Sequence, residues 1–179
     1  LQALHRVRSR LVSRRTATIN QIRAFLIERN ITVRPGLRAL KNSFLKILDE
    51  RADEMSARME TILLGLYEDW LWLDERIEDV TKEIGQIAET ELGSKTVMTI
   101  PGVGPLTSTA VVAAIGDGAG FDRGRDFAAW VGLVPRQYST GGRTMLGGIS
   151  KRGSRYLRTL FVQAARVILM RPHRWEGFS

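Results

Sequence analysis

Cysteine is absent from the 179-residue chain, which excludes disulfide bonds and metal sites built on thiolates. No apolar run approaches the roughly 20 residues that a membrane-spanning helix requires. The first residues, LQALHRVRSRLVSRR, place arginines where a signal peptide would have its apolar segment. We therefore expect a protein of the reducing cytoplasm without a membrane span. Since the chain begins at Leu1 rather than at methionine, we also expect an internal fragment of a longer protein.

Positive charge is what the chain has in excess, with a net charge of +8 and a pI near 10.6. The charge is divided into blocks. Residues 1–38 hold nine arginines against one acid, residues 39–94 hold six bases against fourteen acids, and residues 95–179 hold twelve bases against four acids. Two basic blocks around an acidic one predict two surfaces that face a polyanion.

Apolar residues recur with helical spacing over the N-terminal half. They predict helices over residues 3–30 and 37–48, separated by a turn at Pro35-Gly36. In a longer helix the spacing alternates between four and three residues, the heptad pattern of a coiled coil. The stripe consists of Met59, Leu63, Leu66, Trp70, Leu73, Ile77, Val80, Ile84 and Ile87. It would pack against the chain's own first helix or against a second chain, and we expect a homo-oligomer, a dimer or tetramer, formed through this coiled coil.

Composition changes at Gly93-Ser94 from acidic and helical to basic and glycine-rich. We place a domain boundary there, between a helical assembly region (1–93) and a C-terminal domain (94–179). The predicted fold is mainly α: a long helical coiled-coil segment, then a small helical domain with a helix-hairpin-helix and a glycine-rich loop.

The segment Thr99–Pro105 reads TIPGVGP and is a predicted turn between two short helices. Pro105 suits the first turn of a helix that runs to Ile115. Gly102 and Gly104 allow main-chain N–H groups to face outward at that helix N-terminus, where they can bind a phosphate. The pattern resembles a helix-hairpin-helix that contacts DNA; the alternative is a tight turn between helices that binds nothing.

Three acids, Asp117, Asp122 and Asp126, precede or open a short helix that carries Phe127 and Trp130. Their spacing is poor for a metal site, because no histidine or second carboxylate joins them at ligand distance in the sequence. Helix capping and turn formation explain them as well. We predict no metal ligands in this chain.

The loop Pro135–Gly148 carries an exposed serine, Ser139, between Arg136 and Arg143. A serine hydroxyl becomes a nucleophile when a base or metal activates it and cations stabilise the developing charge. The cations are present, but no base is evident. Taken alone, the residues favour a flexible loop that grips phosphate.

Cations gather at the start of the last predicted helix: Lys151, Arg152, Arg155 and Arg158. Positive charge at a helix N-terminus opposes the helix dipole. We therefore expect these side chains to contact phosphate, with a solvated basic face as the alternative.

Four segments together resemble a known family: QALHRVRSRLVSRRTATINQIRAFL, TIPGVGPLTSTAVVAAIGD, DFAAWVGLVPRQYSTGG and GGISKRGSRYLR. They are similar to the transposases of bacterial insertion sequences of the IS110/IS1111 group. The resemblance implies an N-terminal RuvC-like domain with metal-binding acids, a coiled coil and a C-terminal transposase domain with a serine nucleophile. It also implies a structured guide RNA, and recombination of donor and target DNA through a covalent phosphoserine intermediate.

The family's serine corresponds to Ser139, although the neighbouring Thr140 could occupy that position. The resemblance further implies that a set of basic residues and two glycines grip the DNA or RNA backbone: Arg136, Arg143, Lys151, Arg152, Arg155, Gly102 and Gly104.

No acids equivalent to the family's metal site occur in this chain. The resemblance therefore implies that Mg²⁺ is bound in a domain upstream of Leu1, and that this chain is a truncated transposase that binds nucleic acid and assembles without recombining DNA. The alternative is a non-catalytic module for nucleic-acid binding and oligomerisation. The implied location is the bacterial cytoplasm, at the nucleoid when the protein is bound to DNA.

Overall fold

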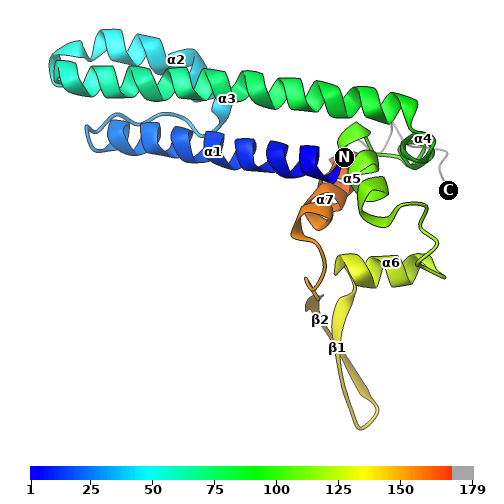
Figure 1. Ribbon diagram of the computed structural model, residues 1–179. Helices are drawn as coiled ribbons and strands as arrows, with labels where there is room; N and C mark the ends of the chain where they lie inside the picture. The colour runs from blue at the N-terminus through cyan, green and yellow to red at the C-terminus, as the bar shows by residue number, and fades with distance from the viewer. Residues whose placement is uncertain (171–179) are drawn as a thin grey trace. The chain divides into compact units, whose positions relative to one another are not determined.

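Helices dominate the computed structural model, which describes residues 1–170 (Figure 1). The helices are α1 (Gln2–Ile27), α2 (Leu37–Glu50), a 3₁₀ turn η1 (Ala52–Glu54), α3 (Ala57–Thr90), α4 (Leu92–Met98), α5 (Pro105–Ile115), α6 (Gly124–Val131) and α7 (Arg155–Met170). Two strands, β1 (Pro135–Thr140) and β2 (Arg143–Ile149), form an antiparallel pair. The predicted mainly-α class is confirmed. None of the helices within residues 1–170 has the length and apolar character needed to cross a membrane.

The chain divides into two compact units. One comprises Arg6–Thr81, and the other joins Leu1–His5 to the chain from Lys82 onward. The division differs from the predicted boundary at Gly93-Ser94, because these two residues pack inside the second unit. A Cβ on Gly93 would lie 3.3 Å from the Val112 side chain, and Ser94 is fully buried with its hydroxyl donating to Glu91 Oε2.

Three helices share the core of the Arg6–Thr81 unit. The core collects Ile19, Ile22 and Leu26 of α1, Leu40, Phe44 and Leu48 of α2, Leu63 and Trp70 of α3, and Ile31 of the intervening loop. Phe44 stacks on Tyr67 with ring centroids 4.5 Å apart. Within each helix these residues are three, four or seven positions apart, so each helix contributes one face to the core.

The heptad stripe of α3 is buried within a single chain. Leu63 and Trp70 belong to the three-helix core, and Leu73 and Ile77 are also buried, at 3% and 6% exposure. Packing against the chain's own helices, one of the two alternatives, is therefore observed for Leu63 and Trp70. Association of two chains through this stripe stays a prediction.

Charged side chains hold the same helices together. Arg15 of α1 and Lys41 of α2 both donate to the carboxylate of Asp74 on α3, at 2.9 and 3.1 Å. Arg23 donates to the carbonyl oxygens of Val33, Arg34 and Gly36 at 2.8 to 3.2 Å. Arg15 and Arg23 therefore serve the fold, although both belong to the first basic block.

The second unit has its own small core, which positions the strands. Ala110 and Val111 of α5, Val131 of α6 and Leu157 of α7 form it. Phe127 of α6 adds ring contacts with Phe121 and Phe161, at centroid distances of 5.4 and 5.7 Å. This core fixes α6 and α7, and the two strands connect these helices.

The first residues of α1 also belong to this unit. His5 is buried, with Nδ1 3.0 Å from the Tyr156 hydroxyl and Nε2 3.1 Å from the Thr109 hydroxyl. The Gln2 side-chain amide donates to the carbonyl of Ala113 at 2.6 Å. The first turn of α1 is thereby bound to α5 and α7.

Candidate functional site

The segment predicted as a flexible loop, Pro135–Gly148, is a β-hairpin. Ser139 pairs with Thr144 and Thr140 with Arg143 across the two strands. Gly141 and Gly142 form the turn with φ of +54° and +78°, the left-handed conformation that a two-residue turn of this type requires at both positions. The loop prediction was wrong because the Gly-Gly pair was interpreted as flexible, whereas it is also a hairpin signal.

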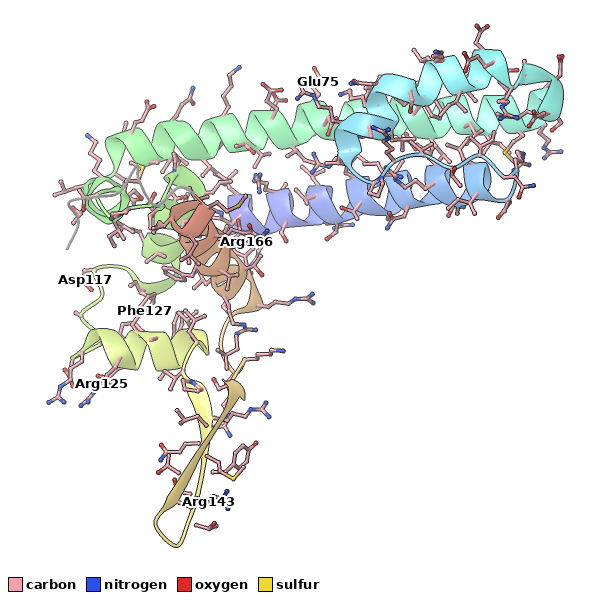
Figure 2. All side chains as sticks on the ribbon, turned by 180° about the vertical axis from the view of Figure 1, so that it is seen from behind. Glu75, Asp117, Arg125, Phe127, Arg143 and Arg166 are labelled. Atoms are coloured by element: carbon pink, nitrogen blue, oxygen red, sulfur yellow. The ribbon has the colours of Figure 1, made fainter. Side chains whose placement is uncertain are left out.

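The hairpin lies outside both hydrophobic cores. Every residue of β1 and β2 is exposed to solvent, and the hairpin extends beyond α6 and α7 within its unit (Figure 1). Arg143 lies close to the turn at the far end (Figure 2). An exposed two-stranded arm stabilises the fold little, so its polar side chains are available to a ligand.

The base of the hairpin is held firmly by main-chain contacts. Ser150 N donates to Val134 O at 2.8 Å, and Lys151 N donates to Gly132 O at 3.0 Å. A Cβ on Gly153 would lie only 1.9 Å from Trp130 O. The chain that leaves β2 is therefore pressed against the C-terminal end of α6.

Ser139 lies on one face of this arm. Successive residues of a strand point to opposite faces, and residues directly opposite in an antiparallel pair share a face. Ser139 therefore shares its face with Gln137, Thr144 and Leu146. The Gln137 amide nitrogen donates to Ser139 Oγ at 2.8 Å, which orients the hydroxyl.

The arginines of the hairpin lie on the other face. The same alternation groups Arg136 with Tyr138 and Thr140, and Arg143 joins them because it pairs with Thr140. Arg136 and Arg143 flank Ser139 in the sequence but do not share its side of the sheet. Within the hairpin, the serine and the cations form two different surfaces.

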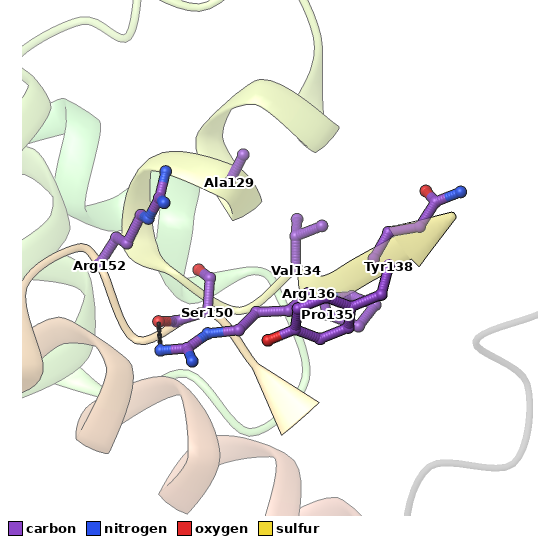
Figure 3. Close-up of a pocket in the computed structure, with 8 residues that line it drawn as sticks. Ala129, Val134, Pro135, Arg136, Tyr138, Ser150 and Arg152 are labelled. Carbon is purple, nitrogen blue, oxygen red and sulfur yellow. Dashed lines mark hydrogen bonds between the residues drawn. The ribbon is translucent and has the colours of Figure 1, made fainter. Parts of the chain in front are cut away.

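A pocket of about 600 Å³ opens at the base of the hairpin (Figure 3). Ala129, Val134, Pro135, Arg136, Gln137, Tyr138, Ser150 and Arg152 line it. Arg136 Nη2 donates to Ser150 O at 3.3 Å, so part of its guanidinium is held against the pocket wall. Two of the predicted phosphate-binding residues, Arg136 and Arg152, are thus brought together.

Arg158 has a contact that the sequence analysis did not anticipate. Its Nη1 donates to Val131 O at 3.0 Å and to Gly153 O at 3.1 Å. Val131 ends α6, where the helix dipole favours a cation. These two hydrogen bonds show that Arg158 joins α7 to the end of α6. Its contact with phosphate stays a prediction. Lys151, Arg152 and Arg155 are exposed.

Gly102 is required by packing as well as by the turn. It has φ +76°, and a Cβ would lie 2.6 Å from Ala164 O and 3.0 Å from the Ile168 side chain. The turn between α4 and α5 therefore rests on α7. Gly104, the residue before α5, has nothing within 4 Å of its Cβ position and stays a candidate for phosphate contact.

One of the three predicted capping or turn aspartates, Asp117, has a local contact. Asp117 Oδ1 accepts a hydrogen bond from Ala119 N at 3.0 Å, which closes a turn. Asp126 lies in the first turn of α6. Within residues 1–170, no group of three or more histidine, aspartate or glutamate side chains comes together as a metal site.

Two residues of the site were missed by the sequence analysis. Gln137 contacts Ser139, and Tyr138 lines the pocket with 60% of its surface exposed. The sequence did carry a signal for Tyr138, because this aromatic residue lies between Arg136 and Arg143. We interpreted the segment as a loop and therefore did not assign Tyr138 to a strand face.

Comparison with known proteins connects this unit to a family. Residues 94–178 match the family model described as Transposase IS116/IS110/IS902 family. The chain is 42% identical over 169 residues to the "Transposase for insertion sequence element IS1111A" of Coxiella burnetii, which covers 94% of this chain and 46% of that protein. It is 40% identical over 178 residues to the "Transposase for insertion sequence element IS1328" of Yersinia enterocolitica, covering 99% and 52%. The chain thus spans about half the length of the curated relatives it matches.

Proposed function

Because residues 94–178 match the model of the IS116/IS110/IS902 family of transposases and the chain is similar to two insertion-sequence transposases, we propose that it forms part of a DNA transposase in which Ser139 attacks a DNA phosphodiester. The observation that carries the proposal is the exposed Ser139 hydroxyl, held by Gln137 on a firmly anchored hairpin, inside the segment that matches the family.

The proposed reaction is a transesterification. Ser139 Oγ attacks the phosphorus, the Oγ–P bond forms, and the bond from phosphorus to one deoxyribose oxygen breaks. The hydroxyl proton passes to a base and the leaving oxygen takes up a proton, so that a phosphoserine link and a free hydroxyl end result. Reversal onto another DNA end releases the serine and joins the strands.

This chain's residues supply orientation to that step. The Gln137 amide donates to Oγ and thereby leaves the serine's own hydrogen free to point to a base. Gln137 carries no basic group, so it positions the nucleophile and does not activate it.

The family resemblance implies that the enzyme uses Mg²⁺. The side chains of residues 1–170 do not fit this ion, because they form no cluster of metal ligands. We propose that the ion belongs to the complete enzyme and assign it no ligand here. The complete enzyme would also bind donor DNA, target DNA and a structured guide RNA, and would act as a homo-oligomer, a dimer or tetramer, through the α3 coiled coil. The cytoplasmic, nucleoid-associated location is part of the same proposal.

The test is the capture of a covalent protein–DNA adduct. The DNA that encodes this chain is expressed together with any coding sequence upstream of Leu1. The resulting protein is incubated with the element's RNA, labelled DNA and Mg²⁺, and the mixture is denatured before electrophoresis. We expect an adduct whose phosphorylated residue maps by mass spectrometry to Ser139, and its loss in Ser139→Ala. Thr144→Ala, on the same face of the hairpin, is the matched control and should retain the adduct.

The neighbouring hydroxyl requires its own variant. Thr140→Ala should retain the adduct, since Thr140 lies on the opposite face from Gln137. If the adduct persists in Ser139→Ala and disappears in Thr140→Ala, the nucleophile is Thr140 and the assignment to Ser139 is refuted.

A second candidate function is nucleic-acid binding without catalysis by this chain. The observation in its favour is the segregation of Arg136 and Arg143 away from the serine, which gives the hairpin a cationic face that needs no chemistry. Equal DNA affinity of the wild type and Ser139→Ala, with no adduct in either, would support this function.

A further inference from the structure

We propose that the pocket at the base of the hairpin binds one unpaired nucleotide of a single strand, its base stacked on Tyr138 and its phosphate held by Arg136 and Arg152. The proposal rests on the proposed function in one respect, namely that the ligand is a nucleic acid. It adds a strand-holding site that is separate from the serine.

Tyr138 is placed as a stacking platform. A Cβ on Gly147 would lie 3.3 Å from Tyr138 Cε2, so the ring packs diagonally over a residue that has no side chain. Although the ring packs against β2, Tyr138 also lines the pocket and remains 60% exposed. An exposed aromatic face of this kind is what single-strand-binding proteins offer to a base.

The charge of the pocket suits a phosphate next to that base. Arg136 and Arg152 line the pocket together with a tyrosine, a glutamine and a serine, and none of its eight lining residues is acidic. The Arg136 guanidinium already donates a hydrogen bond to Ser150 O. The side chain is thus partly ordered before the ligand binds and loses less conformational entropy on binding. The volume of about 600 Å³ is ample for a ligand of the size of one nucleotide.

The same geometry selects an unpaired nucleotide over a duplex. In a double helix each base is covered on both faces by its neighbours, so it cannot reach Tyr138 without leaving the stack. Tyr138 and Ser139 are neighbours whose side chains point to opposite faces of the hairpin. The Tyr138 ring therefore lies on the face away from Ser139, while Gln137, which shares the face of the serine, also lines the pocket.

Binding of short oligonucleotides to the 179-residue chain tests the proposal. Single-stranded DNA and single-stranded RNA of one sequence, each with a central 2-aminopurine, are compared with the matching DNA duplex. We expect the single strands to bind with quenching of the 2-aminopurine fluorescence, and the DNA and RNA titrations to show which sugar the site prefers. Tyr138→Leu should lower single-strand affinity about tenfold and abolish the quenching.

The controls separate stacking from folding and from charge. Tyr138→Phe keeps an aromatic face and should bind as the wild type does. Leu146→Ala removes an equally exposed side chain, 67% exposed, from the opposite face and should have no effect. Circular dichroism of every variant checks that the helices are intact.

Two results would overturn the proposal. One is unchanged single-strand affinity and quenching in Tyr138→Leu; the other is preferential binding of the duplex with no quenching in the single strands. Neither depends on the serine: loss of the adduct from Ser139→Ala tests the catalytic proposal, whereas stacking on Tyr138 is measured without any reaction.

Discussion

Alanine in place of Gly153 is expected to dislodge the base of the hairpin. The added Cβ would lie 1.9 Å from Trp130 O and 2.6 Å from Val131 O. Both oxygens belong to the last residues of α6, which are fixed by the core through Val131. Since neither side can move freely, the segment that joins β2 to α7 must shift by more than an ångström.

The cost follows from two terms. Overpacking of this kind costs about 1–3 kcal/mol. The shift also breaks the hydrogen bonds of Arg158 to Val131 O and Gly153 O, a charged donor whose contribution is about 1.5–3 kcal/mol. Together the second unit should lose about 3–5 kcal/mol of unfolding free energy, a large part of the 5–15 kcal/mol typical of a domain.

Amide hydrogen exchange locates this loss, because it reports each helix separately. Peptides from α6 and α7 should exchange about 100-fold faster or more in Gly153→Ala, while peptides from α2, in the other compact unit, should be unchanged. Gly148→Ala is the matched control, since nothing lies within 4 Å of the Cβ position of Gly148. Wild-type exchange of α6 and α7 in Gly153→Ala would refute the packing argument.

Three further predictions concern the turn, the helical core and the charge of the pocket. Gly102→Ala should destabilise the second unit by about 3 kcal/mol, because alanine is strained in the left-handed conformation and its Cβ would clash with α7. Gly104→Ala should be nearly neutral, and thermal unfolding of both variants measures the difference. Phe44→Ala should cost about 3–5 kcal/mol in denaturant unfolding, since Phe44 is fully buried, while Leu45→Ala, at a position 57% exposed, should cost little. Single-strand affinity should fall steeply with salt. Since both pocket arginines hold one phosphate, replacing them by glutamine should reduce the slope of log K against log[salt] by about 0.7; an unchanged slope would mean that the pocket contacts no phosphate.

Most of the helical structure could be predicted because it depends on spacing along the chain. The predicted helix over 37–48 corresponds to α2 at Leu37–Glu50, and the helix from Pro105 to Ile115 corresponds to α5. In each case a Gly or Pro at the start and apolar residues on one face are local signals. The α3 stripe was likewise correctly predicted as a buried face. Its partner could not be predicted, because spacing does not distinguish a helix of the same chain from one of another chain.

The candidate site was predictable in its residue types and less so in its arrangement. The comparisons agree with the family resemblance, and Ser139, Arg136 and Arg152 all belong to the anchored hairpin or its base. The hairpin itself was not predicted. The alternation of side chains between the two faces of a strand could therefore not be applied to this segment. Only strand pairing separates Ser139 from Arg136 and gives Tyr138 an exposed ring face.

By itself the sequence determined most of the helices, the excess of positive charge and the family resemblance, since each is a property of residues close together in the chain or of their identity. Tertiary structure decided which cations are available. Arg23 donates to three main-chain carbonyls and Arg158 to two. Arg136 donates to one, that of Ser150, and lines a pocket together with Arg152. The physical reason is that an arginine's role depends on the acceptors within reach, and a carbonyl many residues away comes within reach only after folding.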